Sequence, residues 1–135
     1  MHYSSEKMKT FAPIVIRIGL ALVFLWFGYQ QIFSTDMWTI LIPQWAVNLS
    51  GLSAYSLVLI NGWFEVIFGF LLLLGIFTRI SAFLLALHML HITSVVGYNN
   101  IGVRDFGLSM AAISVFLNGV DMWSLDKLFI KNNEK

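Results

Sequence analysis

The sequence predicts an all-α integral membrane protein, a four-helix bundle with one amphipathic segment at the bilayer interface. Hydrophobic residues make up 59% of its 135 residues and charged residues only 11%, whereas soluble domains have about 25% charged residues. Four nearly uncharged runs each approach the length of about 20 residues that a helix needs to cross a hydrocarbon core about 30 Å thick. Because these runs fill most of the chain, we expect a single transmembrane domain over residues 1–135.

The composition also excludes several classes of function. The chain has no cysteine, which rules out disulfide exchange, thiol relays, Cys-ligated zinc and iron–sulfur clusters. Its net charge is +1 and its basic residues are dispersed at the ends of the apolar runs, so no nucleic-acid partner is expected. The expected surroundings are those of the lipid bilayer.

The first span is expected over residues 11–33, with Arg17 as its single charge. The run is too long for the apolar core of a signal peptide, and no small-x-small cleavage motif follows it, so we expect it to stay in the protein. Arg17 and Gln31 share one helical face with small and apolar residues, and this face should point into the bundle. The residues of this face are Arg17, Ala21, Phe24, Gly28 and Gln31.

The segment 36–50 is expected to lie in the bilayer interface. It is interrupted by Pro43 and is too short for a span, yet apolar residues that include Trp38 and Trp45 recur along it at helical spacing. Tryptophan favours the level of the lipid headgroups, and the low charge suits an amphipathic helix or two short turns resting on the bilayer.

The second span is expected over residues 56–77. It carries a stripe of small and polar residues that includes Gly62, Glu65 and Gly69. Small residues let neighbouring helices approach closely in lipid, so this stripe should face another helix.

The third and fourth spans are expected over residues 80–98 and 104–123. The third places His88 and His91 on one helical face. The fourth is the least hydrophobic, and it ends at Trp123 in an interfacial exit followed by a charged tail.

The basic residues predict the orientation of the bundle. Six of them would lie on the side of the membrane that carries both termini, and one, Arg104 beside Asp105, on the other side. The six are Lys7, Lys9, Arg79, Lys127, Lys131 and Lys135. By the positive-inside rule we expect a multi-pass protein of the cell (cytoplasmic) membrane with both termini in the cytoplasm.

Four ionisable residues are expected to line a polar pocket inside the bundle. At a rise of 1.5 Å per residue, Glu65 would lie about 18 Å from the cytoplasmic end of its span, His91 about 16 Å, His88 about 12 Å and Arg17 about 9 Å. Ionising a carboxylate in hydrocarbon costs several kcal/mol, so Glu65 should be protonated or paired with Arg17 or a histidine.

This cluster allows three interpretations. It can be a hydrogen-bonded network that fixes helix packing. It can line a site for a headgroup-like or quinone-like ligand, or a proton path, because a neutral histidine beside a carboxylate exchanges protons near pH 7. Glu65, His88 and His91 could also supply three metal ligands, but nothing in the pattern demands a metal and none is predicted. Two histidines on one helix cannot both ligate one haem, so bis-His ligation would need a dimer.

Four further charged residues flank the fourth span. Arg104 and Asp105 open it at the outer face, where the helix dipole favours Asp105, and we expect a cap and interface charge that can also ring the mouth of a pocket. Asp121 and Asp126 are expected to be solvated.

Nearly the whole chain resembles the DoxX/DoxD-like membrane proteins. The resemblance is carried by "RIGLALVFLWFGYQQIF", "GWFEVIFGFLLLLGIFTRISAFLLA", "RDFGLSMAAISVFLNG" and "WSLDKL". The family's exit motif reads Gly-Pro-Gly-x-aromatic-Ser-Leu-Asp. In this chain, "NGVDMWSLD" keeps Trp123, Ser124, Leu125 and Asp126 but lacks the proline. The positions that match the family pattern are Arg17, Glu65, Arg79, Arg104, Asp105, Trp123, Ser124, Leu125 and Asp126.

The resemblance implies a four-helix membrane protein, and some relatives are the small membrane subunit of thiosulfate:quinone oxidoreductase. We therefore predict a membrane component of a quinone-linked oxidoreductase system, with quinone as the implied cofactor and a partner subunit or a homo-oligomer as the implied assembly. A small transporter or proton pathway is one alternative, and a non-catalytic membrane scaffold or assembly subunit is the other. Because the chain has no cysteine and no soluble domain, we expect it to act as a subunit and not as an enzyme by itself.

Overall fold

The computed structural model describes residues 2–132 and confirms the all-α class. Four of the described helices are long and apolar enough to cross a membrane, and in the first of them this part is Glu6–Phe33. The long helices are α1 (His2–Phe33), α4 (Ala54–Leu74), α5 (Thr78–Val96) and α6 (Asn100–Asn118). The short elements are α2 (Thr35–Trp38), the 3₁₀ helix η1 (Thr39–Leu41), α3 (Gln44–Ser50) and α7 (Asp126–Asn132).

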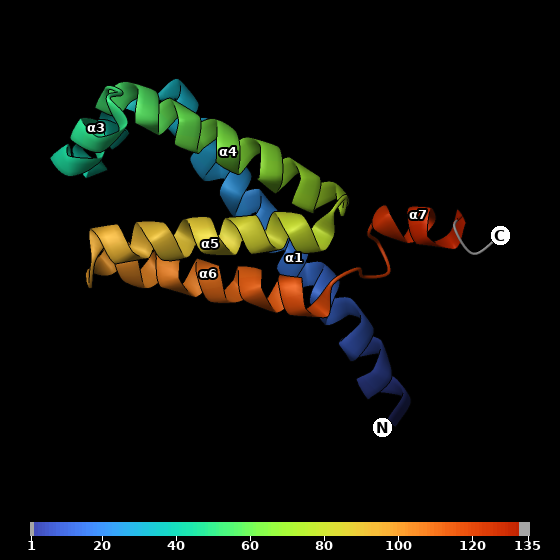
Figure 1. Cartoon of the computed structure of the whole chain (residues 1–135). Helices are drawn as coiled ribbons and strands as arrows, with labels where there is room; N and C mark the ends of the chain where they lie inside the picture. Colours follow the sequence, from blue (N-terminus) through green and yellow to red (C-terminus); the bar gives the residue numbers. More distant parts are fainter. Residues whose placement is uncertain (1, 133–135) are drawn as a thin grey trace.

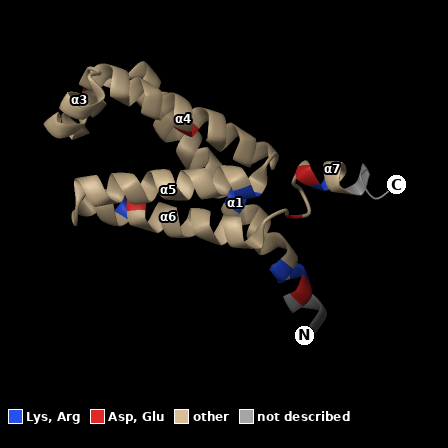
Figure 2. Ribbon diagram, in the orientation of Figure 1, with Lys and Arg blue, Asp and Glu red and all other residues tan. Residues whose placement is uncertain are grey.

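The long helices form two pairs. Helix α1 packs along α4, and α5 packs along α6 (Figure 1). Helices α4 and α5 lie close together at the turn that joins them and separate toward the opposite end, which carries α3 (Figure 1). We call the end with both chain termini the terminal end and the opposite end the α3 end. Charged residues gather mainly at the terminal end (Figure 2).

Glycines set the close approach of α1 and α4. A Cβ atom on Gly28 would lie 2.7 Å from the carbonyl oxygen of Gly62, and one on Gly62 would lie 2.9 Å from the Cβ of Gln31. One on Gly69 would lie 3.1 Å from the Cβ of Phe24. The small stripe predicted in the second span therefore faces α1, as expected of small residues between helices in lipid.

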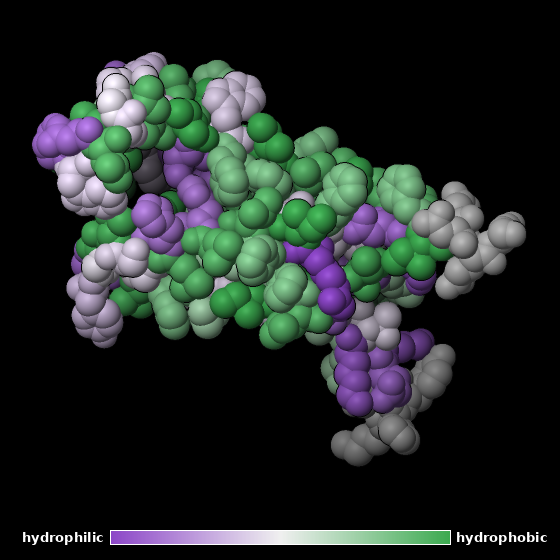
Figure 3. Space-filling view, viewed as in Figure 1, coloured by the Kyte–Doolittle hydropathy of each residue, from purple (hydrophilic) through white to green (hydrophobic). Residues whose placement is uncertain are grey.

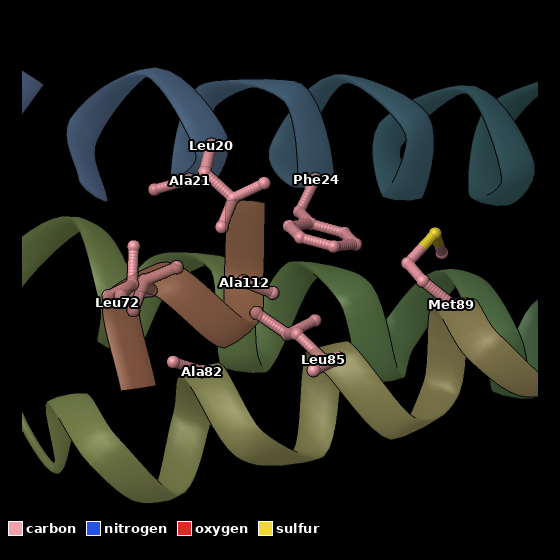
Figure 4. Packing of buried hydrophobic residues seen from close by; sticks show 10 residues of the cluster. Leu20, Ala21, Phe24, Leu72, Ala82, Leu85, Met89 and Ala112 are labelled. Atoms are coloured by element: carbon pink, nitrogen blue, oxygen red, sulfur yellow. The ribbon is translucent and has the colours of Figure 1, made fainter. Parts of the chain in front are cut away.

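The hydrophobic core joins the two helix pairs. Side chains from α1 point toward side chains of α4, α5 and α6 (Figure 4). The face predicted for the first span is confirmed as the buried one, because all five of its residues are buried. The core residues labelled in Figure 4 are Leu20, Ala21, Phe24, Leu72, Ala82, Leu85, Met89 and Ala112.

The outer surface of the bundle is hydrophobic. Large apolar side chains stay exposed along the helices, and they cover the middle of the molecule in Figure 3. Because a lipid tail is as apolar as these side chains, this surface suits a bilayer. Examples are Val15, Leu22, Trp26, Ile60, Trp63, Ile67, Phe70, Ile80 and Phe83.

Helix boundaries differ from the predicted ones where caps decide them. Helix α6 begins at Asn100, four residues before the predicted start, because the side chain of Asn99 accepts hydrogen bonds from the backbone N–H groups of Ile101 and Gly102, both at 3.0 Å. Asn99 is therefore the N-cap of α6, and the prediction that Asp105 takes part in a cap is wrong. Helix α4 ends at Leu74, before the predicted end at 77, because Gly75 adopts φ +69°.

The segment predicted to lie at the interface folds into α2, η1 and α3. Its exposed residues include Met37, Ile40 and Leu49, which are 77%, 86% and 82% accessible. Trp38 turns inward and packs edge-on against Phe27 of α1, with ring centroids 5.9 Å apart. The segment thus presents apolar residues both outward and toward the helix bundle.

Candidate functional site

The carboxylate of Glu65 lies at the centre of a buried hydrogen-bonded cluster. Its side chain is 2% exposed. The amide of Gln31 donates to its Oε2 at 2.9 Å, and the amide of Asn61 donates to its Oε1 at 3.3 Å. The Nε2 of His88 lies 3.3 Å from the same Oε1. Three helices, α1, α4 and α5, therefore supply the partners of one carboxylate.

Local geometry explains why these side chains meet. Asn61 and Glu65 are four residues apart on α4 and so lie on one helical face. The close contact at Gly62 brings α1 against α4 and sets Gln31 beside both, so that Asn61 also donates to the Oε1 of Gln31 at 2.6 Å. The ring of Phe64 packs on the His88 ring, with centroids 4.7 Å apart, which holds the imidazole toward Glu65.

A cavity of about 360 Å³ opens beside this cluster, between the two helix pairs at the α3 end. Figure 3 shows polar residues interrupting the hydrophobic surface at this end of the molecule. Most of the lining is apolar and aromatic, and it includes Trp38 and Trp45 from the segment between α1 and α4. The polar side chains of the lining are Gln31, Asn61, Glu65, His88, His91, Arg104 and Asp105.

Arg104 and Asp105 form a second charged group in the same cavity. The Nε of Arg104 donates to the Oδ1 of Asp105 at 2.7 Å, and the guanidinium lies over the Phe27 ring, 4.5 Å from its centroid. The Asp105 side chain is 4% exposed, whereas that of Arg104 is 41% exposed. Asp105 therefore points inward and Arg104 covers it at the cavity wall.

The two histidines occupy different positions in the cavity. His88 is mostly buried, with 15% of its side chain exposed, and it contacts Glu65. His91, one turn further toward the α3 end, is exposed. Within the described residues, no three His, Cys, Asp or Glu side chains are grouped as a metal ion would require. The arrangement offers a buried carboxylate and imidazole to a ligand at the base of an apolar cavity.

Arg17 does not join this cluster, which corrects its predicted place in the polar pocket. Of the two partners expected for Glu65, Arg17 or a histidine, the structure shows the histidine. Its Nε donates to the Oδ2 of Asp121 at 2.6 Å and its Nη2 to Oδ1 at 3.2 Å. Its Nη1 donates to the carbonyl oxygens of Leu72 and Leu73 at 2.8 and 2.7 Å. These carbonyls belong to the last turn of α4, where helix carbonyls lack partners within the helix and the dipole favours a cation.

Asp121 is buried, so the prediction of a solvated aspartate there is wrong. It lies beyond the last span, on the loop that follows α6, and that loop folds back over the terminal end of the bundle. Burial alone would raise the pKa of Asp121. The hydrogen bonds from Arg17 and from the N–H of Trp123, with the positive charge of Arg17, outweigh burial and set the pKa of Asp121 below its usual value.

Asp126 is also engaged, contrary to its predicted solvation. Its two carboxylate oxygens accept hydrogen bonds from the N–H groups of Phe77 and Thr78, both at 2.7 Å, and so cap the start of α5. The N–H groups of Leu125 and Asp126 donate to the carbonyls of Leu74 and Gly75, the former at 3.2 Å and the latter at 2.9 Å.

The remaining family-pattern positions lie around this turn between α4 and α5. A Cβ atom on Gly75 would lie 2.5 Å from the Cα of Ser124, so the backbones touch there. Arg79 is exposed and its guanidinium packs on Gly119. Trp123 packs edge-on against Phe11 of α1, with centroids 6.3 Å apart. These residues hold the terminal end together and lie away from the cavity.

Gln31, Asn61 and Asp121 belong to the two buried clusters but were not among the predicted site residues: Gln31 was expected only on the inward face of the first span, and Asp121 was expected to be solvated. Gln31 shares the buried face of Arg17, and Asn61 stands one turn before Glu65, so both signals were present in the helical periodicity. The role of Asp121 depends on the path of a loop, for which the helical pattern carries no signal.

Most of the chain matches one known protein family. No curated protein and no solved structure matches the chain. The family model described as DoxX matches residues 12–98, which include most of α1 and all of α4 and α5. Gln31, Asn61, Glu65 and His88 lie within this stretch, whereas Arg104, Asp105 and Asp121 follow it. Since the match covers more than half of the 135 residues, the chain belongs to the DoxX family.

Proposed function

We propose that this protein is a membrane component of a quinone-linked oxidoreductase system, and that the cavity beside Glu65 receives the quinone ring. One observation carries the proposal: an apolar cavity in the membrane-spanning part ends on a buried carboxylate and imidazole 3.3 Å apart. Such pairs are rare in membrane helices because they are costly to bury, and they mark ligand and proton sites.

The chemistry of a quinone fits these groups. Conversion between quinone and quinol moves two protons together with two electrons, so the site needs groups that accept and donate protons. A carboxylate hydrogen-bonded to a histidine can do this near neutral pH. Glu65 and His88 are the groups to which we assign this proton exchange, with His91 exposed near the cavity mouth.

The size and lining of the cavity also suit a ring with an apolar tail. Ligand sites commonly enclose about 300–1,000 Å³ and combine apolar walls with a few polar groups. This cavity has about 360 Å³, and Phe64, Trp38 and Trp45 contribute aromatic walls. The segment that joins α1 to α4 in sequence carries Trp38 and Trp45 and forms part of the cavity wall. Because tryptophan favours the bilayer interface, we expect a lipid-soluble ligand to enter from the bilayer at the α3 end. The electrons would come from, or go to, a partner subunit.

Tryptophan fluorescence tests the proposal. Quinones quench tryptophan on contact, so a short-chain quinone should quench the emission of purified protein saturably, at one site per chain. Replacing the two cavity tryptophans, Trp38→Phe with Trp45→Phe, should remove the saturable part. Replacing two outward-facing ones, Trp26→Phe with Trp63→Phe, should leave it unchanged, since these are 60% and 54% exposed.

Glu65→Gln is the second arm of this test. It keeps the shape of the side chain, removes its charge and adds an N–H donor, so it should change the quinone affinity that quenching measures. Quenching that is unsaturable in the native protein, or indifferent to both the tryptophan pairs and Glu65→Gln, would overturn the proposal.

We also propose that the terminal end faces the cytoplasm. Lys7, Lys9, Arg79 and Lys127 support this orientation through the positive-inside rule, with Arg104 at the opposite end. The chain has no cysteine, so single cysteines report cleanly on topology. In intact cells a membrane-impermeant maleimide should label Asn48→Cys on α3 and spare Thr10→Cys on α1. The reverse labelling pattern would overturn the orientation.

A further inference from the structure

The polar wall of the cavity is rich in hydrogen-bond acceptors. Two carboxylates line it, those of Glu65 and Asp105, and their side chains are only 2% and 4% exposed. A carboxylate offers about four lone-pair positions and, when ionised, no donor. The wall can therefore accept several hydrogen bonds from a ligand.

The buried amides on the same wall donate to protein acceptors, whereas Arg104 and His91, which offer further N–H groups, are exposed. The amide of Gln31 donates to Glu65, and the amide of Asn61 donates to both Glu65 and Gln31. The Nε of Arg104 donates to Asp105. These bonds hold the two amides and the Nε of Arg104 toward protein acceptors, so the buried part of the wall presents mainly acceptors to a ligand.

The two carboxylates differ in how much of their acceptor capacity is used within the protein. In the described part of the chain, Glu65 accepts from Gln31 and Asn61 and contacts His88, and the Oδ1 of Asp105 accepts from Arg104. With about four positions on each carboxylate, most of the unused capacity belongs to Asp105. Glu65 and Asp105 come from different helices, α4 and α6, so they present acceptors from two sides.

From this distribution we infer that the cavity prefers a ligand ring that donates hydrogen bonds, and so binds quinol more tightly than the matching quinone. The inference rests on the proposed function and names the redox form that the site selects. A quinol has two hydroxyl donors, which suit buried carboxylates and form strong charge-assisted hydrogen bonds. A quinone has only carbonyl acceptors, which would face carboxylate lone pairs and leave them unsatisfied.

The expected preference is about tenfold or more, because hydrogen bonds to ionised groups are roughly twice as strong as neutral ones. For a two-electron couple, a tenfold preference for the reduced form raises the potential of the bound couple by about 30 mV.

The test compares three ligands that share one ring and one tail. Isothermal titration of the purified full-length protein, under anaerobic conditions, would measure a short-chain quinol, its quinone and the dimethyl ether of the quinol. The ether keeps the ring and the oxygens and removes both hydroxyl donors. Its affinity therefore shows what hydrogen-bond donation by the ligand contributes, without any change in the protein. The quinol should bind most tightly, with the ether weakened about as much as the quinone.

Two variants assign the effect to the carboxylates. Glu65→Gln and Asp105→Asn each replace an acceptor-only group with an amide that can donate, so each should reduce the ratio of quinol to quinone affinity. The ligand series on the native protein gives a result even where a variant folds poorly.

The outcomes separate the two proposals. Equal binding of the three ligands, or tighter binding of the quinone, would overturn the preference and leave the proposed quinone site standing. Binding of none of them would overturn the proposed site and this inference together.

Discussion

The two ends of the bundle each bury a carboxylate, and they treat it in opposite ways. At the terminal end, Asp121 is held by Arg17 through two hydrogen bonds, and the same guanidinium satisfies two carbonyls of α4. At the α3 end, Glu65 is held by two amides and an imidazole and lies beside a cavity. One carboxylate is enclosed by strong protein contacts, and the other remains available to a ligand.

The two buried sites differ in whether the protein alone satisfies their hydrogen-bonding groups. Four of the five N–H donors of a guanidinium find partners around Arg17, so its site is complete without a ligand. The helices also behave differently at the two ends, because α4 and α5 are tied by the loop 119–126 at one end and diverge at the other. We interpret the terminal end as the structural clamp of the bundle and the α3 end as its functional side.

The largest expected effect comes from breaking the clamp at Arg17. Arg17→Met would leave Asp121 buried without its cation, and removing one partner of a buried ion pair costs about 3–5 kcal/mol of the free energy of unfolding. Denaturant unfolding in detergent, followed by circular dichroism, measures it. The double variant Arg17→Met with Asp121→Leu is the control, and it should be more stable than Arg17→Met alone. If Arg17→Met lost less than about 1 kcal/mol of the free energy of unfolding, the Arg17–Asp121 pair would not be a structural clamp.

The second effect compares two glycines that share a backbone conformation. Gly75 and Gly51 have φ of +69° and +70°, but a Cβ would meet the Ser124 backbone at Gly75 and nothing within 4 Å at Gly51. Gly51→Ala should cost about 1 kcal/mol from strain alone. Gly75→Ala should cost at least about 2–3 kcal/mol, because the tied loop must also move. Equal shifts of the thermal midpoint would show that the loop contact adds nothing.

The third effect comes from Glu65→Gln, which should change ligand affinity more than stability. Glu65→Gln should lower the free energy of unfolding by only about 1–2 kcal/mol, since it weakens hydrogen bonds to a charged group and keeps their geometry. Quinol affinity should fall about tenfold or more, because the charge-assisted hydrogen bond from a quinol hydroxyl to the carboxylate is lost. Gly75→Ala is the matched opposite, a variant that loses stability and keeps affinity at temperatures where it stays folded. If both variants lost affinity in proportion to stability, the two ends would not be functionally distinct.

Much of this comparison could be predicted from the sequence, because helical periodicity reports which face is buried. The four long helices, the inward face of α1 and the glycine stripe of α4 all follow from residue spacing and composition. Periodicity also places Glu65 and His88 on inward faces, and the structure puts them in contact.

The partner of Arg17 could not be predicted in the same way. Depth along a helix placed Arg17 about 9 Å nearer the terminal end than Glu65, and a rise per residue cannot say whether a long side chain bridges such a gap. The structure resolves it through the loop after α6, which brings Asp121 to Arg17. Loops that fold back on the bundle leave no periodic signal, so Asp121 and Asp126 looked like solvated ends.

The smallest effect at ordinary pH is the pH dependence of the stability that Asp121 contributes. The pKa of Asp121 is lower in the folded protein than its usual value, about 3.9 in an unfolded chain. A group with a depressed folded pKa contributes stability that is fully present above the unfolded pKa and is lost as the pH falls through the folded one. Asp121 should therefore add no pH dependence between pH 8 and pH 5, and its contribution should decline below about pH 4.

Thermal midpoints of the native protein and Asp121→Asn, measured from pH 8 to pH 3, should differ by a constant amount down to pH 5 and converge below pH 4. A difference that already shrinks between pH 8 and pH 6 would mean that Asp121 takes up its proton near neutral pH, which contradicts a pKa held down by Arg17.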